Sequence, residues 1–193
     1  MLLEGFILTA IIGRLAGGRF HRLGDVGLRW PWLFVAALAL RAVPPALARG
    51  GWAGARDSVP GFEVAAYALL IIALLFNLRW REIWVAALGV GLNFAVIAAN
   101  GGRMPADLGL VRAIGDKDVA AAVEQGRWPT HTAVDQHTRL PFLADVLALP
   151  RPYPRPHVFS IGDVLITIGV CLFLLRAMGA FGLRAPPAPE VQS

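Results

Sequence analysis

The sequence has little charge and almost no cysteine. Only 16% of its 193 residues are charged, and Cys171 is the single cysteine. A soluble domain averages about 25% charged residues, so this composition argues against an ordinary water-soluble protein. One cysteine excludes a disulfide within the chain. Because Cys171 lies inside an apolar run, it is expected to be a small packing residue rather than a reactive thiol.

Several motifs that carry chemistry are also missing. The chain has no phosphate-binding glycine loop, no nucleophile elbow and no paired-cysteine motif. Its net charge is +5, but the arginines flank apolar runs and form no basic stripe with interleaved aromatic residues. We therefore expect no nucleic-acid partner and no cofactor, and the sequence identifies no protein partner.

Long apolar runs are what the sequence does contain. Hydrophobic residues make up 56% of the chain, and five runs cover residues 2–18, 30–48, 62–78, 83–99 and 161–177. A membrane-spanning helix needs about 20 mainly apolar residues, with a range near 17–25. In lipid only helices and closed barrels satisfy every backbone polar group, and unbroken runs are typical of helices. The predicted fold class is an all-α integral membrane protein with about five transmembrane helices, and its first partner is the lipid bilayer.

One long polar segment interrupts this pattern. The predicted organisation is a four-helix transmembrane region, an extracytoplasmic segment with short helices, a fifth transmembrane helix and a disordered tail, at residues 1–100, 101–157, 158–180 and 181–193. Acidic residues at 116–118 and a later Gly126 predict one of the short helices.

Arginines indicate the orientation. They are concentrated in the short connections after the first and third runs and near the C-terminus. Arginine-rich short loops stay in the cytoplasm. We therefore expect the N-terminus outside, the C-terminus in the cytoplasm and the long polar segment outside.

An acidic residue stands at the start of the fifth apolar run. Asp163 follows Ser160 by three residues, a spacing typical of a helix cap. The alternative is a carboxyl group held at lipid depth, where burial raises its pKa and suits it to acid–base chemistry. Thr167 lies one turn further along the same face and extends a polar stripe. Both interpretations stay open.

A second polar stripe lies on the fourth apolar run. Asn93 and Asn100 are seven residues apart and share a helix face, where hydrogen bonding between helices is the plain explanation. Gly101 and Gly102 then allow a sharp turn whose N–H groups can hold a carbonyl oxygen or an anion. Arg41 lies within the second run and is expected to face a partner or an aqueous cavity.

A possible metal constellation lies in the polar segment. His131, Asp135 and His137 offer two imidazoles and a carboxylate, which suit zinc or iron. Three threonines in the same stretch argue against a helix that would hold these ligands together. A solvated loop is the favoured interpretation, and no metal is predicted.

Four short motifs mark the polar segment and its borders. They are Asn-Gly-Gly-Arg-Met-Pro at 100–105, Thr-His-Thr at 130–132, Thr-Arg-Leu at 138–140 and Phe-Ser-Ile-Gly-Asp at 159–163. Together with the apolar runs they resemble a family of small bacterial membrane proteins, DUF5317, which is a domain of unknown function. The resemblance covers nearly the whole chain. It implies a bacterial, multi-pass protein of the plasma membrane and brings no activity with it.

The last motif also resembles lipoprotein signal peptidase, an aspartyl protease of the membrane. The motif at 159–163 and the Ile-Thr-Ile-Gly-Val that follows at 166–170 are similar in order and spacing to the start of that family's last helix. This resemblance implies a catalytic pair of Asp145 and Asp163, with Asn100 orienting the substrate carbonyl. Two close carboxyl groups do not both ionise, so one would protonate the amide and the other would activate water.

Three function classes follow from these features. The favoured one is a polytopic membrane protein with a polar site at the outer face that binds a lipid, a small molecule or a partner. The expected binding residues are Asn93, Gly101, Gly102, Arg103, Ser160, Thr167 and Arg41. The alternative is the membrane-embedded aspartyl peptidase. A transporter that uses Asp163, Asn93 and Arg41 is third, because five spans without a repeat do not suit alternating access.

Overall fold

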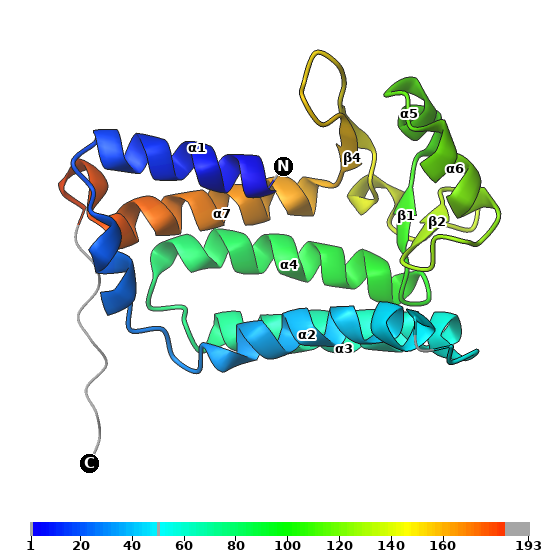
Figure 1. The fold of residues 1–193 in the computed structure, drawn as a ribbon, viewed down its shortest axis with the longest axis horizontal. Coiled ribbons are helices and arrows are strands. Elements are labelled where there is room, and N and C mark those ends of the chain that lie inside the picture. Colours follow the sequence, from blue (N-terminus) through cyan, green and yellow to red (C-terminus); the bar gives the residue numbers. More distant parts are fainter. Residues whose placement is uncertain (1, 50, 184–193) are drawn as a thin grey trace.

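The computed structural model describes residues 2–49 and 51–183, and five long helices dominate it. The helices are α1 (Leu2–Leu15), α2 (Trp32–Arg49), α3 (Ala55–Leu75), α4 (Arg81–Ala99) and α7 (Ile161–Met178). Successive neighbours in the bundle are α1, α7, α4, α3 and α2. Figure 1 shows α1, α7 and α4 side by side, with α2 in front of α3 next to α4. The prediction of a mainly helical protein is confirmed.

Three of these helices suit a membrane by length and composition. Among the described residues, α3, α4 and α7 are both long and apolar enough to cross it. The first helix has 14 residues, and the apolar part of α2 runs only from Trp32 to Pro44. The structure therefore shows three helices of membrane-spanning character, and the five-span topology stays a prediction.

The chain leaves the bundle after α4 and returns to it at α7. Residues 100–160, here called the α4–α7 segment, lie beyond one end of the bundle (Figure 1). Two helices lie in this segment, α5 (Leu108–Ala113) and α6 (Lys117–Glu124). Asp116 caps α6 by accepting a hydrogen bond from the N–H of Val119.

The α4–α7 segment also contains strands that the all-α prediction omits. A parallel pair joins β1 (Met104–Ala106) to β2 (His131–Ala133), and an antiparallel pair joins β3 (Leu147–Leu149) to β4 (His157–Phe159). Each strand has three residues. Strands this short show no alternation of apolar and polar residues, so sequence pattern does not reveal them.

Three short 3₁₀ helices complete the part of the chain that the structure describes. They are η1 (Phe20–Asp25), η2 (Pro141–Leu143) and η3 (Ala180–Gly182). The first lies between α1 and α2 at the bundle end opposite the α4–α7 segment (Figure 1). The predicted tail begins within η3, and its residues 184–193 lie outside the described residues.

Glycines allow α4 and α7 to approach closely. A Cβ atom on Gly89 would lie 2.5 Å from the carbonyl oxygen of Gly162 and 2.8 Å from the backbone nitrogen of Ile166. A Cβ atom on Gly169 would collide with the backbone of Ala86. Small residues let membrane helices pack backbone against backbone. This contact sets the spacing of the two helices that border the α4–α7 segment.

We predict that Gly89→Ala destabilises the protein. The added methyl group would overlap the α7 backbone, and overpacking of this kind costs about 1–3 kcal/mol. Gly91→Ala, two residues along the same helix, is the matched control because a Cβ atom there has nothing within 4 Å. Gly91→Ala should be as stable as the wild type or more stable by up to about 1 kcal/mol, since alanine has a higher helix propensity than glycine. Thermal unfolding in detergent measures both variants, and equal melting temperatures would contradict the packing argument.

Candidate functional site

Two neighbouring cavities lie where the bundle meets the α4–α7 segment. The larger, here called the vestibule, has a volume of about 440 Å³. The smaller, here called the inner cavity, has a volume of about 160 Å³. Arg41, Glu63 and Thr130 line both, so the two cavities are parts of one site.

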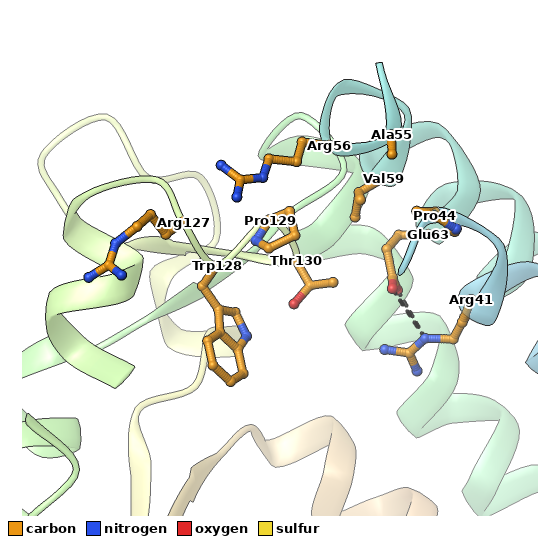
Figure 2. A pocket seen from close by; sticks show the side chains of 10 residues that line it. All are labelled: Arg41, Pro44, Ala55, Arg56, Val59, Glu63, Arg127, Trp128, Pro129 and Thr130. Atoms are coloured by element: carbon orange, nitrogen blue, oxygen red, sulfur yellow. Dashed lines mark hydrogen bonds and ion pairs between the residues drawn. The ribbon is translucent and has the colours of Figure 1, made fainter. Parts of the chain in front are cut away.

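The vestibule combines apolar walls with positive charge (Figure 2). The walls come from α2, α3 and residues 127–130, and consist mainly of Pro44, Ala55, Val59, Trp128 and Pro129. Three arginines also line the vestibule: Arg41, Arg56 and Arg127. In Figure 2 the Arg56 side chain reaches from α3 toward the segment that carries Arg127 and Pro129.

The inner cavity is mainly polar and carries most of the ionisable side chains of the site. Three carboxyl groups line it, on Glu63 of α3, Asp163 of α7 and Asp145 of the α4–α7 segment. The remaining lining residues are Arg41, Tyr67, Asn93, Ile97, Gly102, Met104, Thr130 and His131. Two carboxyl groups of the sequence hypothesis, Asp145 and Asp163, therefore face the same small space.

The partner of Arg41 is Glu63. The Nε atom of Arg41 lies 3.2 Å from each of the two carboxylate oxygens of Glu63. Its guanidinium group also lies 5.6 Å from the ring centroid of Tyr67. The Glu63 residue is only 5% exposed, and a buried charge without a partner is strongly destabilising. This pair explains why an arginine and a glutamate are tolerated within apolar helices.

Asp163 is both a helix cap and a wall of the inner cavity. The Ser160 Oγ accepts a hydrogen bond from the N–H of Asp163, and the Asp163 carboxylate accepts one from the N–H of Ser160. The structure thus shows the capping arrangement that the spacing predicts. The Asn93 side-chain amide joins this cap to α4. Its Nδ2 donates to Asp163 Oδ1 at 2.9 Å, and the Asn93 Oδ1 accepts a hydrogen bond from Ser160 Oγ at 2.8 Å. Thr167 Oγ1 donates to the Asp163 carbonyl oxygen at 2.7 Å.

Asp145 is held beside β1 by backbone hydrogen bonds. Its N–H donates to the carbonyl oxygen of Pro105 at 2.9 Å, and its carbonyl oxygen accepts from Asp107 at 3.1 Å. The carboxylate Oδ2 lies 3.4 Å from His131 Nε2, whereas Oδ1 is buried without a hydrogen-bond partner. Burial raises the pKa of the Asp145 carboxyl group, an effect that the neighbouring His131 opposes.

The possible metal ligands are not brought together. His131 faces Asp145 through Nε2, and its Nδ1 lies 2.8 Å from Thr130 Oγ1. Asp135 is exposed and accepts a hydrogen bond from the N–H of His137 at 2.8 Å, which forms a local turn. Across residues 2–49 and 51–183, no three His, Cys, Asp or Glu side chains gather closely enough to hold a metal ion.

Asn100 anchors a loop instead of lining either cavity. Its Nδ2 donates to the carbonyl oxygen of Arg139 at 2.8 Å, and its Oδ1 accepts from the N–H of Arg139 at 2.9 Å. The turn that follows has positive φ at Gly101 and Gly102, 68° and 79°. Gly102 lies against Pro60 so closely that a Cβ atom would be 2.7 Å from its Cα, and the Gly102 N–H donates to the carbonyl oxygen of Ile97.

The structure therefore gathers part of the predicted site. Arg41, Asn93, Gly102, Asp145 and Asp163 line the inner cavity, as does the weak metal candidate His131. Ser160 and Thr167 contact Asp163 directly. Asn100, Gly101 and Arg103 are not among the residues that line the two cavities, and Arg103 is half-buried.

Sequence reasoning missed five residues that the site uses: Glu63, Tyr67, Arg56, Arg127 and Trp128. A signal existed for Glu63, because it is an acidic residue inside an apolar run and so meets the same criterion as Asp163. No local signal marks Arg56 and Trp128. They meet in the vestibule only because the α4–α7 segment folds back over the ends of α2 and α3.

Comparisons with known proteins place the chain in a family. The family of unknown function DUF5317 matches residues 25–175. A Thermotoga maritima protein named "Uncharacterized protein" is 27% identical over 111 residues, which are 57% of this chain and 60% of that relative. The chain thus matches about 60% of the length of this relative. No solved structure matches the chain. Since the family match covers the helices and the segment that build both cavities, the chain belongs to DUF5317.

Proposed function

We propose that this protein binds a lipid-like ligand with an apolar body and an anionic group. The observation that carries the proposal is the vestibule, in which apolar walls and three arginines surround one space. The single lining carboxylate, Glu63, is paired with Arg41. The exposed side chains of Arg56 and Arg127 therefore leave the vestibule positively charged. Arginine recognises phosphate and carboxylate groups through paired N–H donors.

The proposed location is the plasma membrane of a bacterium, with five passes. Three helices have the required length and composition. The first two long helices also present apolar side chains to their surroundings, among them Ile7, Leu8, Val35 and Leu38, which are 51–74% exposed. A surface of this kind suits lipid rather than water.

The orientation we propose puts the vestibule at the outer face. Arg22 lies in η1, and Arg19 and Arg29 precede and follow that turn in the sequence. The η1 turn is at the end of the bundle opposite the α4–α7 segment, whose residues 127–130 line the vestibule (Figure 1). Arginines in short connections favour the cytoplasmic side. The N-terminus and the α4–α7 segment are then outside, and the C-terminus is in the cytoplasm.

This orientation predicts which surface cysteines react in intact cells. In a Cys171→Ser background, Gln136→Cys should react with a membrane-impermeant maleimide, whereas His21→Cys should react only after the cells are opened. Both positions are exposed in the structure, so accessibility within the protein does not explain a difference. Labelling of His21→Cys, but not of Gln136→Cys, in intact cells would contradict the proposed orientation.

The lipid-binding proposal predicts a loss of affinity when the vestibule arginines are neutralised. The probe is dihexanoyl phosphatidylglycerol, titrated into the purified protein and followed by calorimetry. The double variant Arg56→Gln, Arg127→Gln should bind about tenfold more weakly, because two partly exposed charge contacts contribute together about 1.4 kcal/mol. The control is Arg151→Gln, an exposed arginine of the α4–α7 segment that does not line either cavity. Equal affinities of the double variant and the wild type would contradict the role of the vestibule.

A second candidate function is the aspartyl peptidase, and one observation favours it. Asp145 and Asp163 line the same cavity of about 160 Å³, and the charge of Asp163 adds to the rise in the Asp145 pKa. The two groups also differ in their surroundings. Asp163 accepts hydrogen bonds from Asn93 and Ser160, whereas one oxygen of Asp145 has no donor. A protonated and an ionised carboxyl group are what such a mechanism requires.

The peptidase candidate predicts that purified protein cleaves a lipoprotein signal peptide. Asp145→Asn and Asp163→Asn should each abolish cleavage, because neither amide can exchange the proton that the reaction needs. Asp135→Asn is the matched control, since Asp135 is an exposed aspartate of the same segment. Mass spectrometry of the peptide reports the products. An uncleaved peptide with the wild type, or cleavage that survives both substitutions, would contradict this function.

A further inference from the structure

We propose that the ligand carries a primary ammonium group next to its phosphate, and that the ammonium enters the inner cavity while the phosphate contacts the vestibule arginines. The ligand class is an aminophospholipid of the phosphatidylethanolamine type. This inference rests on the proposed lipid-binding function and names the chemistry of the head group.

Charge in the inner cavity favours a cation. Arg41 and Glu63 neutralise each other. The ionisable groups that remain among the lining residues are the carboxyl groups of Asp145 and Asp163, the His131 ring and the Tyr67 phenol. When both carboxyl groups are ionised, their two negative charges exceed the single positive charge that one histidine can carry. A bound ammonium group therefore lowers the cost of placing the two acids in one enclosed space.

One buried atom lacks the donor that an ammonium group supplies. Asp145 is 6% exposed, and its Oδ1 is buried without a hydrogen-bond partner. Buried polar atoms are nearly always hydrogen-bonded, so this oxygen marks a position for a ligand donor. A primary ammonium has three N–H donors and no acceptor, which fits a space lined by carboxylate oxygens.

The two cavities are arranged for a ligand with two opposite charges. Because Arg41, Glu63 and Thr130 line both spaces, one molecule placed at this boundary reaches both. In an ethanolamine head group only two carbons separate the ammonium from the phosphate oxygen. The phosphate then lies on the arginine side of the boundary, the ammonium lies on the aspartate side, and the acyl chains follow the apolar vestibule walls.

A metal cation fits the inner cavity less well than an organic ammonium. The described acidic and histidine side chains do not converge in a group of three that could coordinate a metal ion. Hard cations require several oxygen ligands at short distance. An ammonium group needs only hydrogen-bond acceptors, and the cavity of about 160 Å³ has room for its methylene groups as well.

The proposal gives a pH dependence with a defined sign. Burial raises the pKa of Asp145 in the empty site, and a bound ammonium favours the ionised form. Binding therefore releases a proton and weakens as the pH falls through that raised pKa. The charged and titratable groups that face Asp145 are His131 of β2, His157 of β4 and Asp163 of α7.

The test compares two lipids that differ in the amine. Dihexanoyl phosphatidylethanolamine and dihexanoyl phosphatidylglycerol are titrated separately into the purified full-length protein. We expect the wild type to bind the ethanolamine lipid about tenfold more tightly. Asp145→Asn should remove this preference, so that the variant binds the two lipids with equal affinity. The control Asp135→Asn should keep both affinities, because its side chain is exposed and lies outside the two cavities.

The outcomes separate this inference from the proposed function. Binding of neither lipid would contradict the proposed function itself. Equal binding of both lipids by the wild type, or a preference that survives Asp145→Asn, would overturn only the ammonium assignment. If Asp145→Asn does not fold, the inference is tested on the wild type by measuring how its lipid preference depends on pH. Its preference for the ethanolamine lipid should then shrink as the pH falls through the raised pKa of Asp145, and a preference that does not change with pH would overturn the inference.

Discussion

The close contact between α4 and α7 is the constraint on which the site depends. Gly89 and Gly162 bring the two backbones together, and there is no space for a Cβ atom between them. At this spacing the Asn93 amide reaches both Ser160 and Asp163 across the interface. The same two helices border the α4–α7 segment, so their contact brings the ends of that segment together. Closing such a loop costs conformational entropy, and the burial of side chains between α4 and α7 offsets this cost.

The α4–α7 segment completes the site because its own hydrogen bonds fold it back over the bundle. Asp145 lies beside β1, where its backbone is hydrogen-bonded to Pro105 and Asp107, and its carboxyl group lines the inner cavity. The Asn100 amide pairs with the backbone of Arg139 and holds a second point of the segment. At the opposite end of the bundle, the Asn77 side-chain amide forms an equivalent pair of hydrogen bonds with the backbone of Arg29 and so holds the connection between α1 and α2. Asparagine is suited to this task because one amide offers both a donor and an acceptor.

Much of the fold, and less of the site, could be predicted from the sequence. The start of α7 was predictable because a serine three residues before an acid forms hydrogen bonds with its own helix turn. Asp116 marked the start of α6 for a similar local reason. The partner of Arg41 was not predictable, since Glu63 lies on another helix and only packing brings the two together. Asp145 was proposed from a resemblance alone. The sequence does not show that this residue is fixed beside β1, because three-residue strands leave no pattern.

The sequence by itself determined that the chain is mainly helical, that at least three helices suit a membrane, and that a polar segment separates α4 from α7. These properties follow from composition and from contacts within a helical turn, which any window of the chain reveals. Only the tertiary structure decided which polar groups share a cavity. Arg56, Trp128 and Asp145 lie far apart along the chain, and their surroundings depend on how the segment folds back over the bundle. The ligand chemistry of the site is set by that long-range packing, because the charge and burial of each group depend on its neighbours in space.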